Sequence, residues 1–332
     1  MRVAAASSAL SPLSSAERIF DRSQHFELHP EPVFIIGHWQ AGHSVLHNLL
    51  AGDPQFATLK LEHVIAPGSR VLRPVLKRSL RGRLPQTRGV DQMPSGLSSL
   101  QGDDFLLAGL TDLSFYYAYV FPTRAEDVFN RALLFDGVSE TEAAAWRTTY
   151  RTAITRVAAE QGRSRFLSRN ASNTTRIPQL LQMFPKAKFI HIARHPAATI
   201  AAQEQRWRAL TDNWSLEPKP TTFFELSLRL FERMTRKYVI DRDRIPPQQL
   251  CEVRCEDLDL NPAAELHRIY EHLQLGNFTP MRNSIANIAS TYVGKLSGSP
   301  DELSAQQMQA VRARCGSALA NFGYEQSIRI GA

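Results

Sequence analysis

Residues 32–56, PVFIIGHWQAGHSVLHNLLAGDPQF, combine residue types and a spacing that can hold an anion. The β-branched and aromatic run Val33–Ile36 predicts a short buried strand, and Ser44–Leu50 has apolar residues at helical spacing. Two glycines, Gly37 and Gly42, bracket the turn between them. This order places the amides of the turn at the N-terminus of a helix, where unpaired N–H groups and a partial positive charge favour a phosphate or a sulfate.

The same turn lacks the side chains of a nucleoside-triphosphate loop. That motif requires a lysine and a hydroxyl residue directly after its second glycine, whereas Gly42 is followed by His43 and Ser44. The sequence therefore predicts an anion cradle built mainly from backbone amides. His43 is a candidate general base or cation beside it, and a helix-start histidine bonded to the backbone is the structural alternative.

A second stretch, residues 166–202, predicts a strand–helix–strand unit. A polar loop leads into a helix over Ile177–Met183, a Phe-Pro pair ends that helix, and Lys188–Ala193 follows as a buried strand. Arg194 comes directly after this strand. Ligands of open α/β sheets collect at the carboxyl ends of the strands, so Arg194 is well placed to bind an anion through its guanidinium.

These two stretches resemble the sulfotransferase family. The first is similar to the family pattern PIFIVGxxRSGTTLLxxLLxxDPxF, and the second is similar to LLKSPxHxxRLPxLLxxFPxARFIHIVRDPRxVVAS. Weaker similarities follow in the family's order at Arg88–Asp91 with Gln101–Phe105, at Val253–Leu258 with Asn261-Pro262, and at Ala320–Tyr324. The agreeing positions in the two main stretches are Pro32, Gly37, Gly42, Leu46, Leu49, Leu50, Asp53, Pro54, Phe56, Arg176, Pro178, Leu180, Leu181, Phe184, Pro185, Ala187, Phe189–Ile192, Arg194 and Pro196.

The resemblance implies an α/β fold, with a single P-loop-like sulfotransferase domain and a central, mainly parallel sheet flanked by helices. We expect this domain to span residues 29–328, after an N-terminal extension over residues 1–28 that is partly disordered. The composition agrees, because 332 residues of which 43% are hydrophobic can bury a large core, and no Gly/Ser- or Pro-rich linker divides the chain. Apolar periodicity predicts further helices over residues 102–118, 142–160, 222–240 and 261–273.

The resemblance also implies a cofactor, the donor adenosine 3′-phosphate 5′-phosphosulfate (PAPS), if donor binding is retained. The family's donor-binding positions correspond here to Gly42, His43, Ser44, Arg169 and Arg194. Sulfuryl transfer builds negative charge on the bridging oxygen and on the transferred group, so its catalysis rests on positioned cations and amides, with a base for the acceptor hydroxyl. His43 is the catalytic candidate in this set.

Several side chains of the family's donor site are replaced. In the 5′ turn, the family's cation, serine and first threonine correspond to Gln40, Ala41 and His43. At the 3′ end, the serine that partners Arg194 corresponds to Ala202. The family's lysine before this region becomes Arg169, its histidine becomes Asn173, and its Glu-Asp-Glu trio becomes Gly102-Asp103-Asp104.

These replacements remove about four donor contacts, each worth on the order of 1.5–3 kcal/mol for a hydrogen bond to a charged group. Losing even half of that predicts a donor affinity weaker by a factor of about a thousand. One interpretation is a pseudo-sulfotransferase that pairs with a homologous catalytic chain, with a homodimer as the other assembly. The alternatives are a working sulfotransferase that holds PAPS in an unusual way, and a repurposed site that binds a sulfated substrate and assists sulfate loss.

The remaining features restrict the class of protein. The net charge of +7 is compatible with an anionic partner or with a solvated basic face, and residues 70–88 contain Lys and Arg without any Asp or Glu. The sequence contains no nucleic-acid-binding motif. No apolar run is long enough to span a membrane, and we expect a cytoplasmic protein that acts on or beside a small-molecule ligand. Cys251, Cys255 and Cys315 have no metal-ligand spacing, so we expect free thiols.

Overall fold

The computed structural model describes residues 25–65, 72–80, 82, 84, 87, 95–282, 285 and 303–324. Its centre is a five-stranded parallel sheet in the order β2-β3-β1-β4-β5, which confirms the predicted α/β class. The strands are β1 (Val33–Gly37), β2 (Phe56–Thr58), β3 (Arg165–Arg169), β4 (Lys188–Ala193) and β5 (Leu250–Arg254). The first 24 residues of the predicted N-terminal extension and the similarity at Arg88–Asp91 lie outside the described residues.

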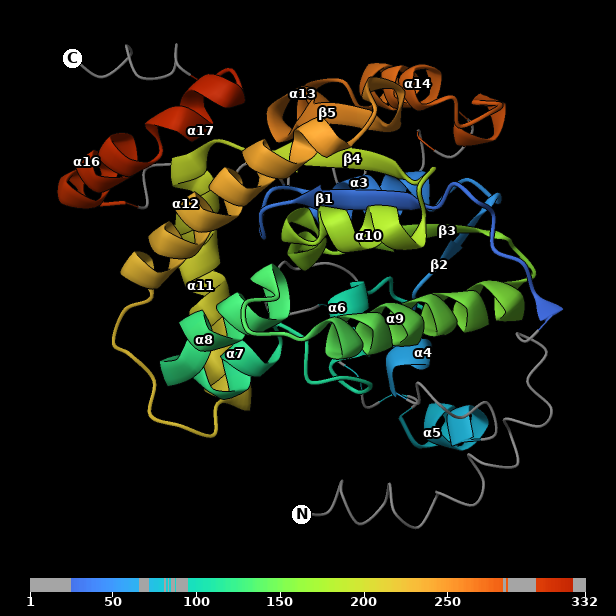
Figure 1. The fold of residues 1–332 in the computed structure, drawn as a ribbon, viewed down its shortest axis with the longest axis horizontal. Helices are drawn as coiled ribbons and strands as arrows, with labels where there is room; N and C mark the ends of the chain where they lie inside the picture. The colour runs from blue at the N-terminus through green and yellow to red at the C-terminus, as the bar shows by residue number, and fades with distance from the viewer. Residues whose placement is uncertain are drawn as a thin grey trace.

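Helices cover both faces of the sheet (Figure 1). The longer ones are α3 (His43–Leu50), α5 (Leu72–Leu80), α9 (Glu140–Gln161), α10 (Ile177–Met183), α11 (Pro196–Trp214), α12 (Phe224–Asp241), α14 (Pro262–Leu273) and α16 (Ala305–Arg314). Short helices are α4 (Leu61–Ile65), α6 (Asp103–Leu107), α7 (Tyr117–Val120), α8 (Ala125–Phe129), α13 (Cys255–Leu260) and α17 (Gly316–Asn321). Short 3₁₀ and π turns join them, among them η4 (Ala171–Thr175).

The central strand β1 shows how the three layers are built, because successive side chains of a strand point to opposite faces. Val33 and Ile35 belong to the core that contains α3, α13 and α14, whereas Phe34 and Ile36 belong to the core that contains α9 and α10. All four side chains are fully buried. A continuous apolar run is therefore what a strand covered on both faces requires.

The strand order brings the candidate site together. β1 lies between β3 and β4, with Ile35 opposite Arg169 of β3 and Gly37 opposite Ile192 of β4. The chain leaves β1 through α3 toward β2, and α10 carries it from β3 past β1 to β4. The carboxyl ends of β3 and β4 therefore flank the turn after β1. The connection from β1 runs toward one edge of the sheet and the connection from β3 runs toward the other edge. Open α/β sheets bind ligands at the point where the strand order reverses in this way.

The predicted helix over residues 102–118 is wrong. The structure has two short helices there, α6 and α7, with a loop between them. The reason is tertiary, because the Asp104 carboxylate is fixed by the buried Arg176 guanidinium at 2.8 Å and also accepts the N–H of Phe115 at 2.8 Å. Pinning Asp104 folds the following chain back on itself, which an uninterrupted helix cannot do. The other predicted helices are present within about two residues of their expected starts.

An aromatic cluster fills the space at one end of the sheet, where α7, α8, α11 and α12 gather (Figure 1). Trp39 of the turn stacks on Phe115 with ring centroids 4.4 Å apart, and Trp207 of α11 lies 4.5 Å from the Tyr119 ring. Trp39 and Trp207 are buried. Both tryptophans therefore pack into the core rather than line an open pocket.

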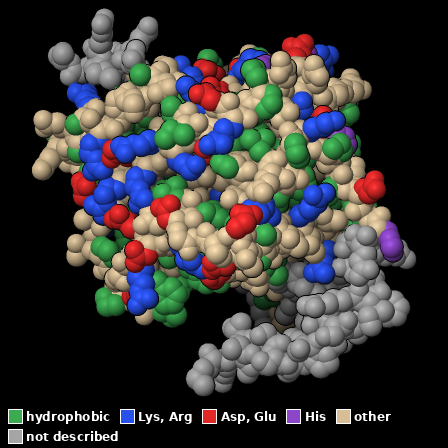
Figure 2. All heavy atoms as spheres, in the orientation of Figure 1, with side chains coloured by type: hydrophobic (Ala, Val, Ile, Leu, Met, Phe, Trp, Pro, Cys, Tyr) green, Lys and Arg blue, Asp and Glu red, His purple; other side chains and the backbone are tan. Residues whose placement is uncertain are grey.

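Other sequence-based expectations have mixed outcomes. Cys251, Cys255 and Cys315 are buried free thiols, as predicted. No helix among the described residues is long and apolar enough to cross a membrane. On the face drawn in Figure 2, Lys and Arg side chains alternate with Asp and Glu, so the positive charge does not form one continuous patch there. Four basic residues of the segment over residues 70–88, Arg70, Arg81, Arg83 and Arg88, lie outside the described residues.

Candidate donor-binding site

The turn after β1 has the backbone shape of an anion cradle. Gly42 caps α3 with φ 98° and no side-chain hydrogen bond to the first turn of the helix, and Gln40 also has a positive φ of 66°. The first amides of a helix have no carbonyl partner within it. An uncapped N-terminus of this kind is suited to an anion, and anion binding by the Gly42–Ser44 amides stays a prediction.

Gly37 begins the turn at a place where only glycine fits. Its φ is 135°, and a Cβ atom built there would lie 2.1 Å from the carbonyl oxygen of Ile192 on β4. The Thr174 hydroxyl, from the turn η4, binds both backbone groups of Gly37, accepting its N–H and donating to its C=O at 2.7 Å each. The start of the turn is therefore fixed by β4 on one side and by η4 on the other.

Arg169 reaches the turn from the end of β3. Its Nη1 atom donates to Ser44 Oγ at 2.5 Å, so two predicted donor-binding residues do come together. Gly102 lies beside this guanidinium, because a Cβ atom at Gly102 would be 3.0 Å from the Arg169 carbonyl oxygen and 3.6 Å from Nη2. The glycine that replaces the family's glutamate thus leaves room for an arginine in place of lysine.

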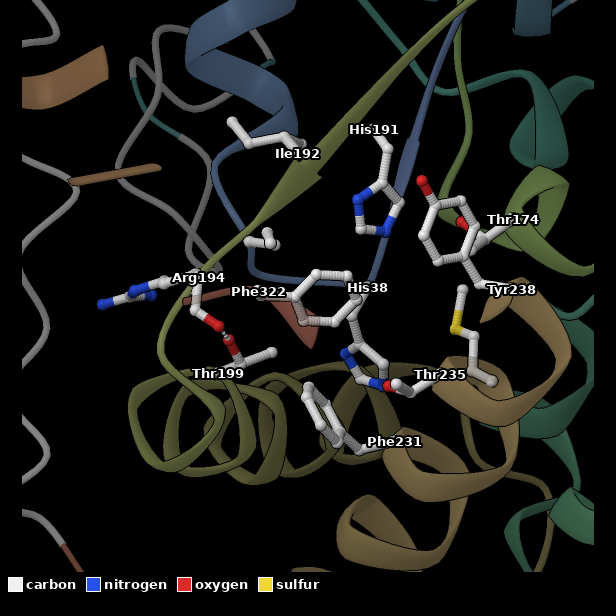
Figure 3. A pocket seen from close by; sticks show the side chains of 13 residues that line it. His38, Thr174, His191, Ile192, Arg194, Thr199, Phe231, Thr235, Tyr238 and Phe322 are labelled. Carbon is white, nitrogen blue, oxygen red and sulfur yellow. Dashed lines mark hydrogen bonds between the residues drawn. The ribbon is translucent and has the colours of Figure 1, made fainter. Parts of the chain in front are cut away.

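Arg194 reaches the turn from the other side, at the end of β4. Its Nη1 atom donates to the Gln40 carbonyl oxygen at 3.0 Å, and its side chain is 9% exposed. Figure 3 shows the Arg194 guanidinium directed away from the small cavity that its backbone borders. The structure therefore brings Arg169 and Arg194 to opposite sides of one turn.

His43 is enclosed rather than presented to a ligand. Its side chain is 6% exposed, and a Cβ atom at Gly37 would lie 3.2 Å from His43 Nε2, so the ring sits under the start of the turn. Burial, with help from the nearby Arg169 and His38, lowers the pKa of His43 to about 3. The imidazole is neutral at physiological pH and does not replace the family's loop cation; its role as a general base stays a prediction.

A cavity of about 20 Å³ lies behind the turn, between β4, α11 and α12 (Figure 3). His38 and His191 line it, and within the described part of the chain His38 Nε2 and His191 Nδ1 have no hydrogen-bond partner. His191 is buried and stacks on Tyr238 with ring centroids 3.7 Å apart, so it packs as a residue of the core. The cavity has room for about one water molecule, and a nucleotide does not fit.

Two neighbouring carboxylates at the start of α6 have different surroundings. Asp104 is ion-paired with Arg176, whereas Asp103 accepts hydrogen bonds from Tyr150 at 2.6 Å and from Ser168. Burial raises the pKa of Asp103 to about 6, although these hydrogen bonds and the Arg169 charge oppose the shift. Sequence reasoning assigned these acids no role, since their signal was only a replaced family trio.

The geometry fits a single anion better than the whole donor. The uncapped α3 terminus, Ser44 and Arg169 converge on one place, where a sulfate or phosphate can be held. Between Gly37 and Ser44, all of which the structure describes, no side chain is cationic at neutral pH. Ala202, which corresponds to the serine that partners Arg194, offers no hydroxyl on α11. The side chains present therefore do not fit PAPS in the way that the family pattern implies.

Comparisons with known proteins agree with this fold and place the chain among sulfotransferases. The chain is 27% identical over 298 residues to the omega-hydroxy-beta-dihydromenaquinone-9 sulfotransferase Stf3 of Mycobacterium bovis and of Mycobacterium tuberculosis, covering 89% of this chain and 76% of each relative. The structure is similar to sulfotransferase STF9 of Mycobacterium avium, with a TM-score of 0.67 and 15% identity over 89% of this chain and 77% of the other. It is also similar to sulfotransferase STF1 of Mycobacterium tuberculosis, with a TM-score of 0.66 and 16% identity over 92% and 81%.

The family model described as "Sulfotransferase family" matches residues 32–280. The matched region holds all five strands and both stretches on which the resemblance was first seen. The chain belongs to the sulfotransferase family.

Proposed function

We propose that this chain is a pseudo-sulfotransferase subunit, which has little donor affinity alone and pairs with a homologous catalytic chain in small-metabolite biosynthesis. The proposal rests on which side chains occupy the turn between β1 and α3. Gln40, Ala41 and a neutral His43 stand where the family has a cation and two hydroxyls. The backbone cradle remains, but the side chains that would distinguish PAPS from another anion are replaced.

The position of Arg194 supports the same proposal. It donates to the Gln40 carbonyl of the chain's own turn, and Ala202 on α11 has no hydroxyl with which to share a phosphate. Removing a donor aimed at developing charge typically lowers a catalytic rate ~10²–10³-fold. A chain with these replacements and an intact core is best explained as a partner that stabilises or shapes an active homologue.

An active PAPS-dependent sulfotransferase acting on a small-molecule hydroxyl is the second candidate. It is favoured by the contact between Arg169 and Ser44, which keeps one cation and one hydroxyl at the α3 terminus. The named substrate of the Stf3 relatives is an omega-hydroxy dihydromenaquinone, an apolar acceptor. Phe105, Tyr116 and Trp214 form a half-buried aromatic stack that begins two residues after Asp103, and such a stack suits an apolar acceptor better than a sugar.

A site that binds a sulfated substrate and assists sulfate loss uses the same single-anion cradle. It needs Arg169 and the α3 amides but no adenosine clamp. Incubating the chain with a sulfated compound in the absence of PAPS separates this candidate from the other two, because only this function releases sulfate from such a compound without PAPS.

Co-expression with a neighbouring sulfotransferase-like gene product tests the proposed pairing. We expect the two chains to elute together in size-exclusion chromatography at micromolar concentration, and we expect sulfate transfer from PAPS only in the mixture. Two separate peaks with no change in transfer rate would contradict the pairing. Transfer by this chain alone to an apolar alcohol would instead support the second candidate, and a homodimer without transfer would leave the chain inactive but unpaired with a homologue.

A further inference from the structure

The turn η4 is a buried polar segment whose four polar residues are each 3% exposed or less. Burying polar side chains is costly unless each has a hydrogen-bond partner. Each of the four polar residues of η4 makes a hydrogen bond to a different segment of the chain. They are Ser172, Asn173, Thr174 and Thr175.

One side of η4 is fixed by the acids at the start of α6. Ser172 donates to Asp104 at 3.2 Å. Asn173 donates to the Tyr150 hydroxyl at 2.9 Å, and that hydroxyl donates to Asp103 at 2.6 Å. This side of η4 is therefore fixed by contacts that do not involve the turn between β1 and α3, residues 37–44, which we call the donor loop.

The other side of η4 holds the donor loop through a single side chain. A hydroxyl can donate one hydrogen bond while it accepts another. Thr174 does both with Gly37, at 2.7 Å in each direction, and so closes a ring on the backbone of one residue. Gly37 is also the residue whose backbone conformation and contact with Ile192 allow no side chain.

We propose that Thr174 is a positioning residue for the donor loop, and that η4 holds the loop in its anion-binding shape independently of the side chains at positions 40, 41 and 43. This inference extends the proposed function and rests on it only for the binding measurement below. It explains how a turn that has lost family side chains keeps its positive-φ backbone at Gln40 and Gly42. It also assigns a role to a position that the family pattern leaves variable.

Hydrogen exchange of the isolated chain, followed by mass spectrometry on peptides covering residues 34–44, tests the proposal. Thr174→Val keeps the shape of the side chain but leaves the Gly37 N–H and C=O without their partner. We expect exchange in this peptide to rise by at least about tenfold, since the amide loses its buried hydrogen bond. Thr174→Ser retains the hydroxyl and should return the exchange rate to within about threefold of the original.

Thr175→Val is the matched control, because its hydroxyl donates to the Leu133 and Ser172 carbonyls and does not contact Gly37. It should lower global stability in urea comparably while leaving exchange over residues 34–44 unchanged. Inorganic pyrophosphate is the binding probe, and Thr174→Val should weaken its binding at least about fivefold relative to Thr175→Val. Equal loop exchange in the two valine variants would overturn the proposal. Tight PAPS binding by the unmodified chain would refute the proposed function but would not alter the exchange comparison.

Discussion

The triple variant Gln40→Arg, Ala41→Ser and Ala202→Ser is expected to bind PAPS at least about 100-fold more tightly than the original chain. Each change returns a group that the family places on a donor phosphate, and a hydrogen bond to a charged group contributes on the order of 1.5–3 kcal/mol. The gain requires the turn to have kept its shape, as its positive-φ residues Gln40 and Gly42 indicate. Isothermal titration of both proteins with PAPS measures the difference.

A control must separate restored contacts from added charge. Gln306→Arg with Ala305→Ser adds one cation and one hydroxyl at exposed positions on α16, outside the turn. Its affinity for PAPS should equal that of the original chain within about twofold. If the triple variant gains no more than this control, the pocket has been reshaped beyond these three positions, and our account of the lost contacts is incorrect.

The largest loss of stability is expected from Arg176→Ala. The guanidinium is fully buried, pairs with Asp104 at 2.8 Å, and donates to the Ala132 and Leu113 carbonyls. Removing one partner of a buried ion pair leaves an uncompensated charge, which costs about 3–5 kcal/mol. Urea denaturation should show this loss in the free energy of unfolding, together with a loosened loop between α6 and α7.

Arg208→Ala on α11 provides the comparison, since the Arg208 side chain, which pairs with Glu204, is 56% exposed. Exposed pairs of this kind contribute roughly 0–1 kcal/mol. If Arg176→Ala does not accumulate as folded protein, Arg176→Lys keeps a charge with fewer donors and should show an intermediate loss. A cost for Arg176→Lys no greater than that for Arg208→Ala would contradict the role of this pair in holding α6.

Local pattern predicted the elements that carry the site. Val33–Ile36 and Lys188–Ala193 read as buried strands because a strand covered on both faces is apolar throughout, and the structure confirms both. The helix Ile177–Met183 has the predicted bounds, since a proline lies in its first turn and a Phe-Pro pair follows it. Arg194 could be placed at the edge of the sheet because it directly follows a strand.

Contacts between distant segments could not be predicted. The break in the helix expected over residues 102–118 depends on Arg176, which lies 72 residues after its partner Asp104. The hydrogen bonds between Thr174 and the Gly37 backbone join residues that are 137 positions apart. The burial of His43, and hence its neutral state, depends on how the turn closes over the ring. Each of these facts is set by packing rather than by local sequence.

Titration of the unmodified chain alone with PAPS is the measurement that tests the proposed function most directly. Gln40, Ala41 and Ala202 stand where the family has a cation and two hydroxyls, and burial lowers the pKa of His43, so in our proposal the loop offers a donor phosphate no charged side chain. We therefore predict a dissociation constant weaker than about 100 µM, with most of the residual binding due to one anion held by Arg169 and the α3 terminus. A dissociation constant in the low micromolar range would contradict the pseudoenzyme account and would favour a working sulfotransferase.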